Sequence, residues 1–187
     1  DLVSAMMLAV SMMFLRFMIL ILIFSTSIFL NIYPYLLIMS ATAAGIGIFI
    51  HKKHTIKGER EVIEETETES NPLEFKVALI FALLFVVFTF LTHYTLVYAG
   101  TGGLSILSIA TGLSDITPFI LNLLQGGNIP ATIVGACIMQ AIISNIVVNM
   151  FYAIFFSSRR KEMLPYVWKG FLTVIGVNAV LLLIYYF

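Results

Sequence analysis

The chain has 187 residues, of which 60% are apolar and 11% charged, with a formal net charge of zero and a mean hydropathy of +1.05. This composition is typical of an integral membrane protein, because a soluble domain of this length needs many more polar residues to cover its core. The balanced charge argues against nucleic acid as a partner, and the single Cys137 excludes an intrachain disulfide and a cysteine-based zinc site.

The chain begins at Asp1 and is apolar from Leu2 onward. It has no initiating methionine, and it lacks the basic region and small-residue cleavage site of a signal peptide. We therefore expect the sequence to be the carboxy-terminal part of a longer polypeptide.

Five windows of the sequence are long and apolar enough for transmembrane helices, which need about 20 residues each. A sixth window, 103–125, is also long enough but is interrupted by "ATGLSDITPFI" from Ala110 to Ile120. The expected fold class is an all-α integral membrane protein with about five full transmembrane helices and one broken or re-entrant helical segment. The five uninterrupted windows are 2–24, 32–50, 75–99, 129–156 and 165–187.

The segment "HKKHTIKGEREVIEETETESNP", residues 51–72, is basic in its first part and acidic afterwards. A charge run of this kind is usually a solvated loop, and His51 and His54 would need a further ligand to hold a metal. A second basic cluster, Arg159 to Lys161, separates the last two windows. Because loops rich in Lys and Arg stay in the cytoplasm, we place both segments on the cytoplasmic side.

With both basic loops inside, the chain between them must cross the membrane an even number of times. The windows 75–99 and 129–156 already supply two crossings, so the parity predicts that 103–125 is a re-entrant hairpin open to the outer side. Gly112 is suited to end a helix in the left-handed conformation, and Thr117 before Pro118 is typical of an N-cap and first turn. The alternative is an ordinary span whose Ser and Thr side chains bond back to their own helix.

An internal repeat is indicated by "PYLLIMSATAAG" from Pro34 and "PYVWKGFLTVIG" from Pro165, which share Pro, Tyr, Thr and Gly in register. Chance similarity between apolar helices is the alternative. A re-entrant hairpin would make the repeat inverted, a common plan among transporters. The predicted organisation is then two helices that end a first repeat in 1–50, a charged cytoplasmic loop in 51–74, and a second repeat in 75–187 with helices at 75–99, 103–125, 129–156 and 165–187.

Asp115 lies inside an apolar window, where a carboxylate costs about 2.5 to 3.5 kcal/mol, so it should face a cavity or a partner. Its neighbours Thr111, Ser114 and Thr117 carry hydroxyls that can replace the hydration of a cation. Arg16, more than halfway along the first window, is the candidate charge partner. The predicted site for an ion or substrate is therefore centred on Asp115.

The next window adds four polar residues, which we include in the predicted site: Gln140 and Ser144, and Asn145 and Asn149. The members of each pair are four positions apart and so nearly share a helix face. They either line the site or hold helices together, since such side chains commonly bond across membrane helices. The sequence has no Gly-rich phosphate loop, no metal-binding His/Glu helix and no Ser/His/Asp set, so we expect neither an enzyme nor a cofactor.

Three segments resemble the membrane domain of unknown function 4010: "NPLEFKVALIFALLF" from Asn71, "GLSDITP" from Gly112 and "SNIVVN" from Ser144. That domain typically follows an MgtC/SapB-type membrane domain, so the resemblance implies a multi-pass protein of the bacterial or archaeal inner membrane. Two positions depart from the family pattern. Thr117 stands where a second aspartate is usual, and Asn149 where a basic residue is frequent, so the site here carries less charge.

The sequence thus predicts a transporter or channel-like protein for a small ion or solute. The alternative is a non-transporting regulator or assembly partner of MgtC/SapB type, in which the polar residues only bond helices together. The expected partners are the lipid bilayer, a missing amino-terminal membrane domain and a second copy in a homo-oligomer.

Overall fold

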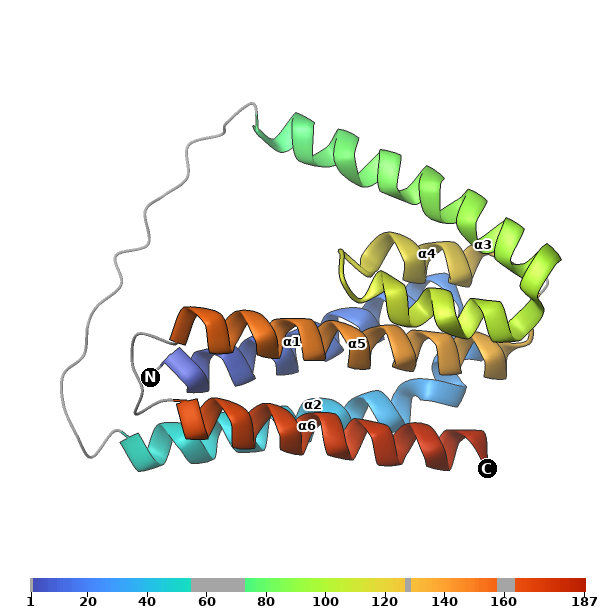
Figure 1. The fold of residues 1–187 in the computed structure, drawn as a ribbon. Helices are drawn as coiled ribbons and strands as arrows, with labels where there is room; N and C mark the ends of the chain where they lie inside the picture. Colours follow the sequence, from blue (N-terminus) through green and yellow to red (C-terminus); the bar gives the residue numbers. More distant parts are fainter. Residues whose placement is uncertain (1, 55–72, 127–128, 158–163) are drawn as a thin grey trace.

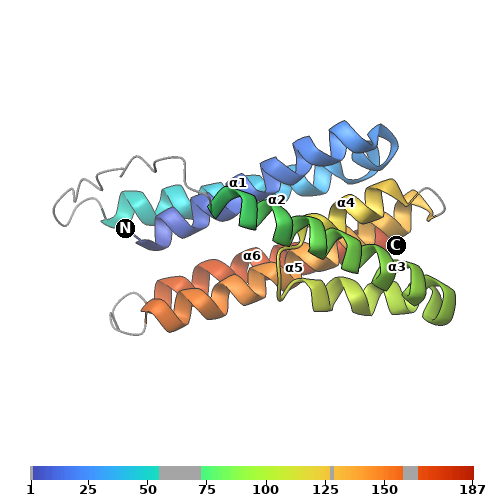
Figure 2. The same ribbon diagram turned by 90° about the horizontal axis from the view of Figure 1, so that it is seen from above.

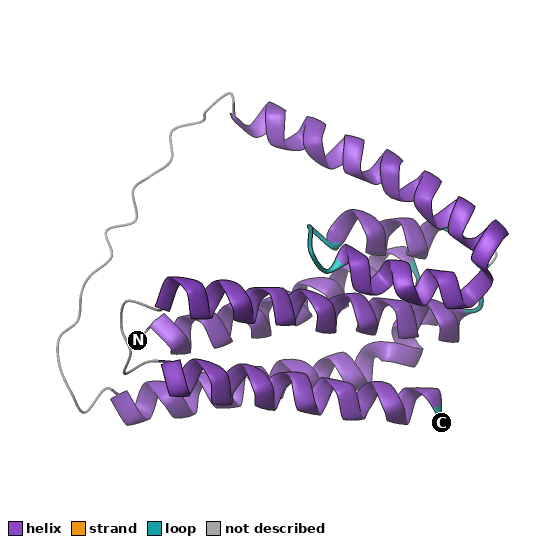
Figure 3. Cartoon of the chain, viewed as in Figure 1, coloured by secondary structure: helices purple, strands orange, loops and turns teal. Residues whose placement is uncertain are grey.

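A computed structural model describes residues 2–54, 73–126, 129–157 and 164–187 (Figure 1). These residues form helices and the turns between them, without a β-strand in the described ranges (Figure 3). Five of the helices are long and apolar enough to cross a membrane, which confirms the all-α membrane class. The helices are α1 (Leu2–Phe24), α2 (Thr26–His54), α3 (Leu73–Thr111), α4 (Thr117–Gln125), α5 (Ala131–Ser157) and α6 (Leu164–Tyr186).

α1 and α2 form a tight antiparallel hairpin with only Ser25 between them. Near its open end, Ser4 Oγ donates to the carbonyl oxygen of Gly47 at 2.8 Å. Gly47 allows this close approach, because a Cβ there would lie 3.2 Å from side-chain atoms of Met7 and Leu8. Small residues and hydroxyl groups at helix crossings are the usual means by which membrane helices pack closely.

The start of the second predicted window was wrong. α2 begins at Thr26 rather than near residue 32, so Pro34 lies inside the helix and not in its first turn. A proline in a helix interior costs about 3 kcal/mol through its lost N–H bond. Ile28 and Ile32 precede it and are buried, so the added helical turn gains apolar packing that offsets this cost.

The α1–α2 hairpin lies beside the α5–α6 pair, and α2 packs against both α5 and α6 (Figures 1 and 2). α3 and α4 pack against each other and against α5. The core joins these parts through fully buried aromatic and aliphatic side chains from α1, α2, α4 and α6: Phe14, Phe17, Leu36, Phe119 and Phe171.

The sixth apolar window, 103–125, is broken at residues 112–116, as predicted. A separate interruption lies just before this window. The helical conformation of α3 is interrupted at Gly100, where φ is 61° and ψ is −152°. Such a backbone conformation is essentially confined to glycine, and it reverses the direction of the chain. Residues 101–111 then run back along the bundle, the chain turns at 112–116, and α4 returns to the end from which it came (Figure 1).

The turn at 112–116 lies partway along the length of the bundle, and both ends of the hairpin lie at the end where α5 begins (Figure 1). This is the geometry of a re-entrant hairpin rather than of a full span. The end of α2, the end of α5 and the start of α6 lie together at the opposite end. The basic residues Lys57, Arg60 and Arg159 to Lys161 lie outside the described residues, but three of the helix ends that flank them, those of α2, α5 and α6, lie on one side.

α2 and α6, which carry the two similar motifs, run in opposite directions (Figure 1). That is the relation expected if the repeat is inverted. The division of the chain at residues 50 and 75 stays a prediction.

Candidate functional site

The last turn of α3, just before the turn at 112–116, carries hydroxyl groups that donate hydrogen bonds to its own backbone. Thr111 Oγ1 donates to the carbonyl oxygen of Ser108 at 2.7 Å, and Ser114 Oγ donates to that of Thr111 at 3.1 Å. The carbonyl oxygen of Thr111 also accepts the backbone N–H of Ser114 at 3.0 Å, so the hydroxyl groups add to the backbone bonds of this last turn. Thr111 is buried, whereas Ser114 is exposed, so of these two only Ser114 is accessible from outside the protein.

Gly112 is required by packing and not by a left-handed backbone, which corrects the sequence-based expectation. Among the described glycines, the positive φ belongs to Gly100. A Cβ on Gly112 would lie 2.3 Å from Cβ and Oγ of Ser144 and 2.7 Å from the backbone nitrogen of Asn145. Only glycine lets the break approach α5 this closely.

α5 holds the break through the two residues that Gly112 touches. Ser144 Oγ donates to the carbonyl oxygen of Ile109 at 2.7 Å, and Asn145 Nδ2 donates to that of Gly112 at 3.3 Å. The carbonyl oxygen of Ile109 also accepts the backbone N–H of Gly112 at 3.3 Å, so the bond from Ser144 adds to a backbone bond at this turn. Ser144 and Asn145 therefore position the turn, which is the packing role that the sequence left open for them.

Asp115 is exposed and caps the start of α4. Its Oδ1 accepts the backbone N–H of Thr117 at 2.9 Å and the hydroxyl of Thr117 at 2.7 Å. The expectation that Thr117 is the N-cap was wrong, because Ile116 occupies that position and Thr117 begins the helix. A carboxylate at this place is favoured by the positive end of the helix dipole.

Arg16 joins the same group from α1. Its Nη2 donates to Thr117 Oγ1 at 2.8 Å, so this hydroxyl accepts from the guanidinium and donates to the carboxylate. The predicted pairing of Arg16 with Asp115 is thus realised through a bridging hydroxyl rather than as a direct contact. Thr117 is the residue that makes this bridge.

A chain of amides leads away from the turn along α5. Asn149 Nδ2 donates to Asn145 Oδ1 at 3.1 Å, and Asn145 in turn holds Gly112. Gln140 does not join this chain, because its Nε2 donates to the hydroxyl of Tyr186 on α6 at 3.0 Å. The structure therefore brings together the predicted residues from Thr111 to Thr117 with Arg16, Ser144, Asn145 and Asn149, and places Gln140 elsewhere.

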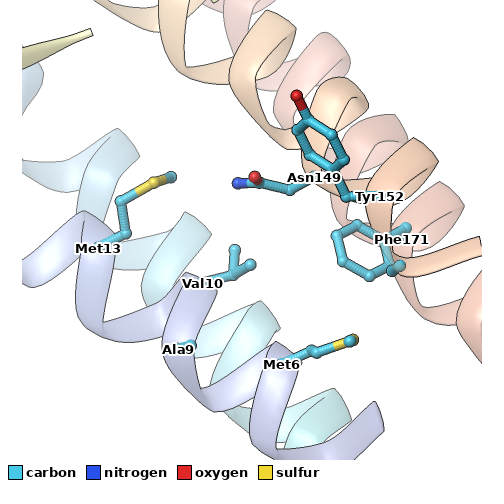
Figure 4. Close-up of a pocket in the computed structure, with 8 residues that line it drawn as sticks. Met6, Ala9, Val10, Met13, Asn149, Tyr152 and Phe171 are labelled. Carbon is cyan, nitrogen blue, oxygen red and sulfur yellow. The ribbon is translucent and has the colours of Figure 1, made fainter. Parts of the chain in front are cut away.

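Asn149 also borders a groove that the sequence did not reveal. The groove has a volume of about 320 Å³ and lies between α1, α5 and α6 (Figure 4). Apart from Asn149, its residues look in the sequence like ordinary lipid-facing or core positions of apolar helices. Its lining residues are Met6, Ala9, Val10, Met13, Asn149, Tyr152, Ala153 and Phe171.

Within the described part of the chain, no three His, Cys, Asp or Glu side chains come together as metal ligands. A cation at the turn would therefore be bound by Asp115 together with hydroxyl or backbone oxygens and water. The segment 51–72, which contains His51 and His54, lies mostly outside the described residues.

An uncharacterized protein of Aquifex aeolicus (strain VF5) is 24% identical over 153 residues, which are 80% of this chain and 63% of that relative. The chain thus spans less than two thirds of the length of that relative. No solved structure matches. The family described as "Domain of unknown function (DUF4010)" matches residues 1–157, which include α1 to α5 and the whole hydrogen-bonded group around Asp115, so the chain belongs to this family.

Proposed function

We propose that this multi-pass membrane protein is a transporter or channel-like protein for a small ion or solute, with its site at the turn between α3 and α4. One observation carries the proposal: an exposed carboxylate, Asp115, lies at a helix break partway along the bundle and is linked through Thr117 to Arg16.

The physical argument concerns where such a turn is tolerated. Irregular backbone at membrane depth is stable only where protein covers it or where it lines a water-filled cavity, because lipid cannot satisfy free N–H and C=O groups. The described residues leave the middle of the turn uncovered, since Leu113 is 73% exposed and Ser114 and Asp115 are exposed as well. A water-lined path beside the turn resolves this conflict, and such a path is what transport requires.

The arrangement suggests a role for each charged group. Thr117 uses Oδ1 of Asp115, which leaves Oδ2 to bind a cation, a cationic group of a solute or a coupling proton. Arg16 balances the charge of Asp115 when no ligand is bound, which lowers the cost of keeping either ion in the membrane. Ser144 and Asn145 keep the turn in place while the ligand passes. We propose no enzymatic step at this site.

The alternative, a non-transporting regulator or assembly partner, is favoured by the exposure of α3. Only 11% of its most apolar window is buried, against 33% to 50% in the other four spanning helices. Such a helix offers a long apolar face either to lipid or to another membrane protein. In that case the group around Asp115 would serve only to hold α1 to the hairpin.

Water access distinguishes these functions. In a Cys137→Ala background, Ser114→Cys is expected to react with small aqueous thiol reagents when the full-length protein is embedded in liposomes. Val86→Cys is the control, because Val86 is 49% exposed and lies within the first part of α3, where it faces lipid in our proposal. Equal protection of both cysteines would mean that the turn is dry and would contradict the transport proposal.

Flux provides the direct test. Asp115→Asn keeps an oxygen that can accept both bonds from Thr117 while it removes the charge, so the fold should persist. We expect uptake of the transported ion or solute by proteoliposomes, found by screening radiolabelled candidates with the unchanged protein, to fall at least tenfold. Undiminished uptake by the folded Asp115→Asn variant would remove Asp115 from the site.

A further inference from the structure

The groove between α1, α5 and α6 has the size of a ligand site. Its volume of about 320 Å³ falls at the lower end of the range of about 300 to 1,000 Å³ that is usual for small-molecule pockets. One wall comes from α1, the other from α5, and α6 adds one aromatic ring (Figure 4). The lining residues are Met6, Ala9, Val10 and Met13 of α1, Asn149, Tyr152 and Ala153 of α5, and Phe171 of α6.

The walls determine the charge of any ligand. None of the lining residues is charged, so an ion in the groove would lose its hydration without gaining a counter-ion. Met6 and Met13 are flexible and polarizable, and such side chains adapt to ligands of irregular shape. The walls therefore favour an uncharged, mostly apolar molecule.

One end of the groove carries a hydrogen-bonding group. The bond from Asn149 to Asn145 uses one of the two N–H groups on Nδ2 and fixes the orientation of the amide. The second N–H and the carbonyl oxygen Oδ1 can then bond to a ligand. Figure 4 shows the amide directed toward Met13, while Met6 and Phe171 lie toward the other end.

We propose that this groove binds an uncharged amphiphile of the long-chain alcohol class, with its hydroxyl at Asn149 and its hydrocarbon part along Met6 and Phe171. The amide at one end matches a hydroxyl, and the remaining apolar length matches a hydrocarbon chain. This binding goes beyond the proposed transport, because it requires neither Asp115 nor movement of a solute across the membrane.

The test uses full-length protein in phosphatidylcholine liposomes and two photoactivatable probes, dodecanol and dodecane, each with a diazirine near its chain end. Dodecanol should label peptides of α1 and α5 that line the groove, and unlabelled dodecanol should compete for this labelling. Asn149→Ala should weaken the competition by about 3- to 10-fold, the loss expected for one hydrogen bond. Ala9→Phe should abolish the labelling by filling the groove, whereas Ala179→Phe, at an exposed position of α6 outside the groove, should preserve it.

Equal labelling of the groove by dodecane and dodecanol, unchanged in Asn149→Ala, would mean that an ordinary acyl chain of the bilayer fills it and would overturn the proposal. Labelling that survives Ala9→Phe would overturn it as well, and this variant is decisive even where Asn149→Ala fails to fold. Asp115→Asn should leave the labelling unchanged. Failure of the groove proposal is therefore distinguishable from failure of the transport proposal, which is measured by flux.

Discussion

Arg16 on α1 donates a hydrogen bond of 2.8 Å to the hydroxyl of Thr117 at the start of α4, 101 positions later in the chain. Thr117 donates the same hydroxyl to Asp115 at 2.7 Å, so one oxygen joins a guanidinium to a carboxylate. Each charge partly compensates the other, which lowers the cost of placing both within a membrane. The contact also fastens the first helix to the turn of the hairpin.

Thr117→Val should break this bridge while it keeps the shape of the side chain. Arg16 would lose its hydrogen bond to the hairpin, and Asp115 would keep only its bond to the backbone N–H. Loss of hydrogen bonds to charged groups typically costs about 1.5 to 3 kcal/mol. We expect a lower midpoint of thermal unfolding for the purified protein in detergent. Thr117→Ser retains the hydroxyl and should unfold close to the unchanged protein; a similar loss in both variants would contradict the bridge.

Gly112→Ala should displace the turn from α5. The added methyl group would lie 2.3 Å from Ser144 Cβ, too close for two carbon atoms, and overpacking of this kind costs about 1 to 3 kcal/mol. We expect reduced thermal stability and weaker flux, because the turn moves. Gly102→Ala is the matched control, since no atom lies within 4 Å of a Cβ at that position. Equal effects of the two substitutions would argue against the close packing of Gly112 on α5.

Gly100→Ala should destabilise the reversal of α3 for a different reason. Nothing lies within 4 Å of a Cβ at Gly100, so space is not the obstacle. The backbone there has φ of 61° and ψ of −152°, and a side chain held in such a region costs about 1 to 3 kcal/mol. We expect a lower unfolding midpoint than for Gly176→Ala, another glycine with open space around it but with helical backbone. A neutral Gly100→Ala would mean that the chain does not reverse in this way.

The hairpin predicts a specific labelling pattern for single cysteines in a Cys137→Ala background. Gly102→Cys and Gln125→Cys stand near the two ends of the hairpin and should react with a membrane-impermeant thiol reagent from the same side. Lys52→Cys and Pro165→Cys stand at the other end of the bundle and should react only from the opposite side, which we expect to be the cytoplasm. Reaction of the first two cysteines from opposite sides would establish a full span and exclude the hairpin.

The membrane class and the broken window follow from local sequence. Apolar runs of about 20 residues form helices wherever a bilayer or an apolar core surrounds them, because only helices satisfy their own backbone bonds there. The run from Gly112 to Pro118 interrupts such a window, and the structure breaks the helix at this place. Local composition did not predict where α2 begins. The helix starts before Pro34 and continues past it, because the apolar residues that precede the proline are buried.

The roles of individual polar residues depended on contacts between helices far apart in the chain. The sequence marked Gly112 for its backbone freedom, but the approach of Ser144 explains why glycine stands there. It grouped Gln140 with Ser144 by helical spacing, but Gln140 bonds to Tyr186 on α6. Spacing along one helix specifies which residues share a face, whereas the neighbouring helix decides what that face meets.

By itself, the sequence determined that this protein is a helical membrane protein with a carboxylate at a helix break, since apolar length and helix-breaking residues act locally. Only the tertiary structure decided that Thr117 bridges Asp115 to Arg16, that α5 clamps the turn, and that a groove opens beside Asn149. These features arise from the packing of distant helices, whose apolar surfaces are too alike in sequence to specify their partners.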